Sequence, residues 1–190
     1  MRQFGLSLLM ILLALSFTLD ANAQRKKKKR KQKGDVEIVV PCTGPEFMTN
    51  NQYIRATGMA LSNDMSVAKK KCMAAARSEI ALAIEAKVKT VTDQYVSSYQ
   101  MGEEDETKQR FEEMTRQAAK QTLSGLRIIC DKMMKTPEGK YRAYVTLELA
   151  GKDLLNTITD DIMKDDKLRV DFEYEKFKEV FEEEMQNYTE

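Results

Sequence analysis

Ten consecutive residues, 140–149, alternate strictly between polar and apolar side chains, and this run limits the possible folds more than any other feature. Alternation with period two is typical of a β-strand that buries one face and exposes the other to water. Residues 136–139 fit a type I turn with Pro137 second and Gly139 fourth. The sequence therefore predicts an antiparallel hairpin from 126 to 149, with Tyr141 in the core and Tyr144 on the wet face, available for contacts.

A long helix is predicted before this hairpin. Apolar residues recur every three or four positions, which is the spacing of an amphipathic helix. Asp64 and its two predecessors offer N-cap side chains, so we expect the helix to run from about residue 65 to 99. The strand expected at residues 53–60 carries Gly58, which suits a bulge or a helix that crosses closely over the sheet. The helical stripe consists of Met73, Ala76, Ile80, Ile84, Val88, Val91 and Tyr95.

The other expected elements are shorter. A second helix spans about 104–124 and ends near Gly125, for which a positive φ is expected. Another helix is expected after Gly151, and a last one at about 171–188. The aromatic stripe of this last helix is expected to pack on its own domain. A short strand is predicted at 36–40. The fold class is α+β, with long helices on one face of a small antiparallel sheet, in two layers and in the order strand, helix, helix, hairpin, helix.

The N-terminal residues predict where in the cell the protein is located. Residues 4–19 are almost entirely apolar, follow a single charge at Arg2 and lead into Ala21-Asn22-Ala23. This pattern is that of a secretory signal peptide, too short for a membrane span, so we expect cleavage after Ala23 and no transmembrane segment afterwards. The expected organisation is a signal peptide at 1–23, a basic tether at 24–34, an extension at 35–52, a domain at 53–150 and acidic C-terminal helices at 151–190.

The tether suggests a surface-binding alternative. It carries eight positive charges, whereas residues 34–190 carry 22 basic and 29 acidic side chains. Such a run either binds an anionic surface such as lipid or lipopolysaccharide, or only keeps the chain solvated. If it binds, its removal should abolish the attraction, to which the acidic body should add nothing; nucleic acid is not an expected partner. The candidate residues are Arg25, Lys26, Lys27, Lys28, Lys29, Arg30, Lys31 and Lys33.

The sequence offers little for catalysis. It contains no histidine, which removes the commonest general base and transition-metal ligand, and we expect no catalytic residue, metal or cofactor. Of three cysteines, Cys42 is expected in any disulfide, while Cys72 and Cys130 are expected to be buried and inert. A carboxylate-based envelope hydrolase remains an alternative, although the acidic pairs are expected to be solvated surface charge. These pairs are Glu103-Glu104, Glu112-Glu113, Asp160-Asp161 and Asp165-Asp166.

One ordered set of short motifs resembles a known family. A strand ends in Arg55-Ala56-Thr57-Gly58, and the following helix contains Ala75-Ala76-Arg77. Ser124-Gly125-Leu126 then leads into a strand, and Gly139-Lys140-Tyr141 opens its partner. In this order the motifs resemble the LPP-twenty lipoprotein domain of bacterial envelope proteins, which is similar to the N-terminal domain of flagellar assembly protein T.

The resemblance implies an α+β domain in the periplasm or at the outer membrane of a Gram-negative bacterium. It further implies a structural or protein-interaction role with an envelope protein as partner, and no active site. The chain departs from the lipoprotein members of this family because it has no cysteine at the cleavage site. Anchoring through acyl chains is therefore not expected.

Overall fold

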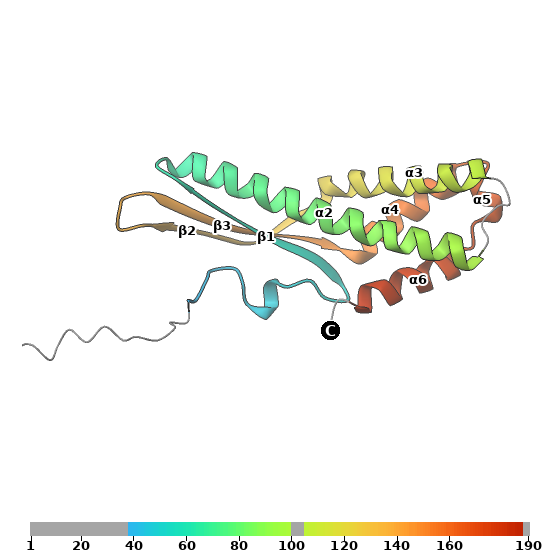
Figure 1. The fold of residues 1–190 in the computed structure, drawn as a ribbon, viewed down its shortest axis with the longest axis horizontal. Helices are drawn as coiled ribbons and strands as arrows, with labels where there is room; N and C mark the ends of the chain where they lie inside the picture. The colour runs from blue at the N-terminus through green and yellow to red at the C-terminus, as the bar shows by residue number, and fades with distance from the viewer. Residues whose placement is uncertain (1–37, 100–104, 188–190) are drawn as a thin grey trace, which may run out of the picture. The chain divides into compact units, whose positions relative to one another are not determined.

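The computed structural model describes residues 38–99 and 105–187 (Figure 1). The predicted signal peptide, residues 1–23, and the predicted tether, 24–34, lie outside these ranges. The chain from Val40 onward forms one compact unit. In it a three-stranded antiparallel sheet packs against helices, so the predicted α+β class is confirmed.

The sheet consists of β1 (Tyr53–Ser62), β2 (Arg127–Lys135) and β3 (Tyr141–Ala150), with β3 in the middle. The predicted hairpin of β2 and β3 is confirmed. In its turn the backbone N–H of Gly139 donates to the carbonyl of Thr136 at 2.9 Å, and Gly139 has a φ of 82°. This positive φ explains the glycine, because other residues rarely adopt it.

Helix α2 (Met65–Tyr99) has the predicted bounds. Its start is capped as expected, since the backbone N–H of Val67 donates to Oδ1 of Asp64 at 2.8 Å. The helix crosses β1 at Gly58, where a Cβ would lie only 2.5 Å from the backbone N of Ala76 and the carbonyl O of Cys72. Of the two roles expected for Gly58, the close helix crossing is the one found.

The remaining helical elements are η2 (Pro45–Phe47), α3 (Asp105–Thr122), η3 (Leu123–Gly125), α4 (Gly151–Lys164), α5 (Leu168–Asp171) and α6 (Tyr174–Gln186). The last helix was predicted to begin at about residue 171; it begins at Tyr174, and the short helix α5 before it was not predicted. Phe172 turns into the core between α5 and α6, and the backbone N–H of Glu173 donates to the hydroxyl of Tyr95 at 2.8 Å. The positive φ expected at Gly125 is also wrong, because the chain leaves α3 through a 3₁₀ turn.

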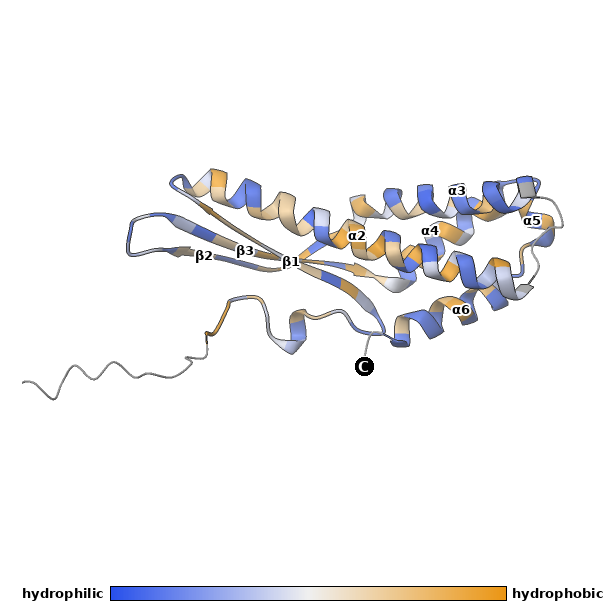
Figure 2. Ribbon diagram, viewed as in Figure 1, coloured by the Kyte–Doolittle hydropathy of each residue, from blue (hydrophilic) through white to orange (hydrophobic). Residues whose placement is uncertain are grey.

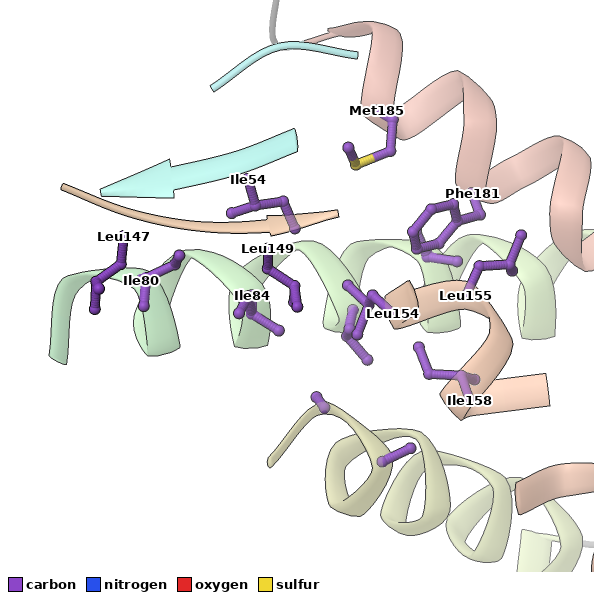
Figure 3. Packing of buried hydrophobic residues seen from close by; sticks show 14 of the residues in the cluster. Ile54, Ile80, Ile84, Leu147, Leu149, Leu154, Leu155, Ile158, Phe181 and Met185 are labelled. Atoms are coloured by element: carbon purple, nitrogen blue, oxygen red, sulfur yellow. The ribbon is translucent and has the colours of Figure 1, made fainter. Parts of the chain in front are cut away.

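A single main core joins the helices to the inner face of the sheet (Figure 3). The apolar positions of α2 turn toward it, whereas α3 is largely hydrophilic on its outer side (Figure 2). At one end, the rings of Tyr95, Phe111 and Phe177 all contact one another, with centroid distances of 5.3 to 6.0 Å. Phe177, Phe181 and Met185 of the predicted stripe are buried and pack on their own domain as expected, whereas Tyr174 is 40% exposed. Tyr188, the last member of that stripe, lies outside the described ranges.

The strand predicted at 36–40 is not found in its described part. Residues 38–40 have no regular structure, and the side chains of Ile38 and Val39 are 79% and 89% exposed. Residues 36 and 37 lie outside the described ranges. Within those ranges β1 and β2 pair only with β3, so residues 38–40 have no strand partner that would make them extended.

Candidate functional site: the strapped face of the sheet

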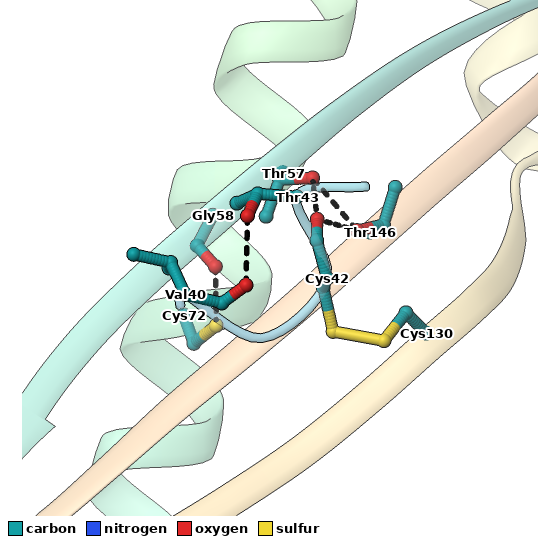
Figure 4. The surroundings of a disulfide bond; sticks show 8 residues. All are labelled: Val40, Cys42, Thr43, Thr57, Gly58, Cys72, Cys130 and Thr146. Atoms are coloured by element: carbon teal, nitrogen blue, oxygen red, sulfur yellow. Dashed lines mark hydrogen bonds between the residues drawn. A yellow bond between two sulfur atoms is a disulfide. The ribbon is translucent and has the colours of Figure 1, made fainter. Parts of the chain in front are cut away.

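The face of the sheet opposite α2 is crossed by residues 40–49, which we call the strap. Gly58 faces α2, so its neighbour Thr57 points to the other face. There the hydroxyls of Thr57 and Thr146 hydrogen-bond to each other at 2.7 Å, and the carbonyl oxygen of Cys42 lies within hydrogen-bond distance of both, at 3.1 and 3.3 Å (Figure 4). A disulfide joins Cys42 to Cys130 of β2, with a Cα–Cα distance of 5.8 Å, and fixes the strap to the strand at the edge of the sheet.

The strap overturns the prediction that β3 has one wet face. Every residue from Ala143 to Leu149 is buried, including Tyr144, which packs with the disulfide and Phe47 instead of facing a partner. Tyr141, expected in the core, is half-buried. Alternation along a strand reports which side chains are polar, but a second layer over the polar face leaves no trace in that pattern.

On the same face, an ion pair joins β1 to β3 near the end of the strap. The guanidinium of Arg55 contacts the carboxylate of Glu148 at 2.7 Å, and each of these side chains is 11% exposed. The same guanidinium donates to the carbonyl of Met48 at 2.9 Å. The Thr49 hydroxyl accepts from the N–H of Arg55 at 2.9 Å and donates to its carbonyl at 3.1 Å, so the strap satisfies backbone groups of β1. Sequence reasoning missed these two charged partners because they lie 93 positions apart.

The cysteines follow the predictions in part. Cys42 is in the disulfide, as expected. Cys130 was expected to be inert and is instead its partner, because β2 lies beside the strap and not in the main core. Cys72 is a buried free thiol, as expected, and its burial raises its pKa.

Among the described residues, neither the strap nor any other segment covers this face where it reaches the β1–α2 and β2–β3 turns. Beyond the row of Thr57, Thr146 and Cys130, the register places Leu61 and Met134 on either side of Arg142. Leu61 and Met134 are 43% and 50% exposed, and Met59 is 59% exposed. Large apolar side chains thus face outward in adjacent rows of the sheet. Because exposing them to water does not stabilise the protein, such a group of side chains marks an interaction site.

The same end of the unit is basic. The β1–α2 turn and the β2–β3 turn lie at this end (Figure 1), and an ion pair of 2.5 Å between Lys69 and Asp131 joins α2 to β2 there. We define the hairpin end as residues 59–71 and 131–142; it holds seven basic and three acidic side chains, whereas the rest of 34–190 holds 15 basic and 26 acidic ones. The basic residues are Lys69, Lys70, Lys71, Lys132, Lys135, Lys140 and Arg142, all exposed.

At the opposite end, two charged pairs join helices. Asp165, expected to be a surface charge, is buried at 5% side-chain exposure, and its carboxylate accepts two hydrogen bonds from Arg110 of α3. This contact holds the pKa of Asp165 below its usual range. Lys87 of α2 is 1% exposed and donates to the backbone carbonyl of Glu184 in α6, and burial lowers its pKa. Both pairs stabilise packing between helices.

The described surface also has concavities. One, of about 680 Å³, lies between the start of β1, the start of α4 and α6, and its walls carry Arg127, Lys152 and Lys178 as well as Asp153 and Glu182. This mixture of charges favours no ligand of one sign. A groove of about 400 Å³ lies between α2 and α3, above a hydrogen bond of 3.1 Å between the hydroxyls of Thr92 and Thr115.

The predicted site residues, Arg25 to Lys33, lie outside the described ranges, so the structure does not place them. Within 38–99 and 105–187, no group of His, Cys, Asp and Glu side chains could hold a metal ion. None of the helices described is long and apolar enough to cross a membrane. The sequence matches no protein-family model and no curated protein.

Proposed function

We propose that this protein is exported to the cell envelope and acts there as a structural or protein-interaction module related to the LPP-twenty lipoprotein domain. The observation that carries the proposal is the Cys42–Cys130 disulfide. Disulfides form and persist in oxidising compartments such as the periplasm and are rare in the cytosol. The signal-peptide pattern of residues 1–23 supports the same address, and the α+β arrangement agrees with the family resemblance.

The test uses protein isolated from the envelope fraction of its own organism. We expect the mature chain to begin at Gln24, Cys42 and Cys130 to be linked, and Cys72 to alkylate only after unfolding. Peptide mapping by mass spectrometry with and without reduction measures all three. An intact Met1 together with reduced Cys42 and Cys130 in the cytosolic fraction would contradict export.

Its interaction role is tested separately by crosslinking in intact cells. A structural or interaction protein should give the same discrete crosslinked species from independent crosslinkers placed at different surface positions. Because Leu82 and Met163 are exposed and lie outside the hairpin end, cysteine substitutions there provide two such positions. If only the uncrosslinked monomer is recovered with every crosslinker position, the result would count against this role.

A second candidate function is attachment to anionic lipid or lipopolysaccharide through the tether, which its eight positive charges favour. Polybasic segments gain on the order of 1 kcal/mol per Lys or Arg near an anionic membrane and lose it in salt. Deleting residues 25–33 should weaken sedimentation with anionic vesicles and leave the thermal midpoint unchanged. Equal sedimentation of both chains would rule the tether out.

A further inference from the structure

The uncovered hairpin end combines two properties that the overall charge of the body conceals. Residues 34–190 have an acidic excess, yet that excess lies entirely outside the hairpin end, which is net basic. From the sequence, the body was expected to add nothing to an attraction for anionic surfaces. That expectation assumed that the acidic charge is spread evenly over the body. Because exposed charges are screened beyond about 10 Å at ~0.1 M salt, the charges nearest a surface decide whether it attracts or repels the protein.

Apolar side chains are placed among these basic groups. Met59, Leu61 and Met134 project from the outer face of the sheet, and Met65 and Val67 open α2 at the same end, with exposed fractions between 40% and 59%. Lysine and arginine beside them can extend their charged groups toward phosphates while their stems cover apolar surface. A soluble polyanion would match the charges but not the apolar side chains. A bilayer with anionic headgroups matches both, as it does for amphipathic helices at the interface.

We infer that the hairpin end is a docking surface for a phospholipid bilayer that contains anionic lipid. The body lies with the β1–α2 and β2–β3 turns toward the bilayer. Lys70, Lys132 and Lys140 lie near the headgroups, and the apolar side chains of Met59, Leu61 and Met134 enter the boundary between headgroups and acyl chains. The acidic helices α4 to α6 at the other end are then directed away from the anionic surface. This inference goes beyond the proposed function and does not require the tether.

The experiment uses a chain that begins at residue 34, so that neither the apolar N-terminal segment nor the tether contributes. This chain keeps the whole core, because every buried residue of the described ranges lies at or after Cys42. Sedimentation is measured with vesicles of phosphatidylcholine alone and of phosphatidylcholine mixed with phosphatidylglycerol. We expect binding to the mixed vesicles only, which weakens strongly toward ~1 M salt.

Two sets of substitutions separate charge from apolar contact. The first combines Lys70→Glu, Lys132→Glu and Lys140→Glu; the second combines Met59→Thr, Leu61→Thr and Met134→Thr, which retain β-propensity. Each set should weaken binding about tenfold or more. Two control sets act outside the hairpin end: Lys120→Glu with Lys152→Glu, and Leu82→Ser with Met163→Ser, at residues that are equally exposed. These should leave binding within about twofold.

Methionine methyl signals give a readout of orientation that does not depend on substitutions. With spin-labelled lipid in the vesicles, the methyl resonances of Met59 and Met134 should broaden, while that of Met163, 53% exposed in α4, should not. Absence of binding to mixed vesicles at low salt would overturn the inference, as would equal broadening of all three signals. Loss of binding in the charge set with no change in the apolar set would also overturn it, because the attraction would then be electrostatic only and the apolar side chains would not enter the bilayer. None of these outcomes bears on export, which the peptide mapping tests.

Discussion

The thiol of Cys72 in α2 donates a hydrogen bond of 3.1 Å to the carbonyl of Gly58 in β1. The helix lies so near the strand that no side chain fits between them, since a Cβ on Gly58 would approach the carbonyl O of Cys72 to 2.5 Å. Both of the nearest atoms belong to the α2 backbone, so the clash cannot be relieved by turning a side chain. The contact fixes α2 on the inner face and leaves the outer face to the strap.

Gly58→Ala should therefore destabilise the protein by about 1–3 kcal/mol, toward the upper end of that range, because α2 must shift away from the sheet. Urea unfolding followed by circular dichroism measures the change. Gly125→Ala is the matched control, since nothing lies within 4 Å of its Cβ position and its φ is not positive. Equal effects of the two substitutions would show that the close crossing does not limit stability.

Removal of the disulfide should loosen the strap and lower stability. The bond connects residues 88 positions apart, and closing so long a loop restricts the unfolded chain strongly. We expect the double variant Cys42→Ser, Cys130→Ser to lose about 2–4 kcal/mol in urea unfolding. Amide exchange should quicken at Tyr144 and Thr146, which the strap covers, and stay slow at Ile84 in the main core. Unchanged protection at Tyr144 would mean that the strap holds without its covalent link.

The Arg110–Asp165 contact makes stability depend on acid pH. The pKa of Asp165 is lowered in the folded protein, first by its hydrogen bonds to Arg110, so its contribution is complete above the pKa of the unfolded chain. It is lost as the pH falls through the lower, folded value. Arg110→Gln should raise the pKa of Asp165 toward its ordinary value and shift this loss to higher pH.

Carboxyl carbon NMR titration of Asp165 measures the first effect, and urea unfolding between pH ~3 and ~7 the second. The matched control is Lys164→Gln, because Lys164 pairs with Asp161 at 3.2 Å while 73% exposed. Loss of this exposed ion pair should change the free energy of unfolding little. An Asp165 titration that is the same in both variants would contradict the prediction.

Lys87 should also make stability rise with pH, but in the alkaline range. Its pKa is lowered by burial, so between the folded and unfolded values the unfolded chain binds more protons and stability rises with pH. Lys87→Met removes this rise, and at pH ~7 it should cost about 1–3 kcal/mol because the carbonyl of Glu184 loses its donor. Unfolding of both proteins from pH ~7 to ~10 is compared, with Lys89→Met as the exposed control. A constant difference across this range would refute the lowered pKa.

Local patterns in the sequence determined the bounds of α2, the hairpin with its turn at Gly139 and the burial of Phe177, Phe181 and Met185 in α6. Helical and strand periods, the cap at Asp64 and the turn glycine act over a few residues, so they can be read without the rest of the chain. The close approach at Gly58 was also among the expected alternatives. These signals were enough for the fold class.

Only the tertiary structure decided what covers the outer face of β3, which cysteine pairs with Cys42, and that Asp165 is buried. Each depends on residues far apart in sequence: Cys130 lies 88 positions from Cys42, and Arg110 lies 55 from Asp165. Periodicity carries no record of a partner at such a distance, because a polar side chain reads the same whether water or another side chain satisfies it. The basic hairpin end arises in the same way, since two segments that are separate in the sequence supply its charges and are joined only in the fold.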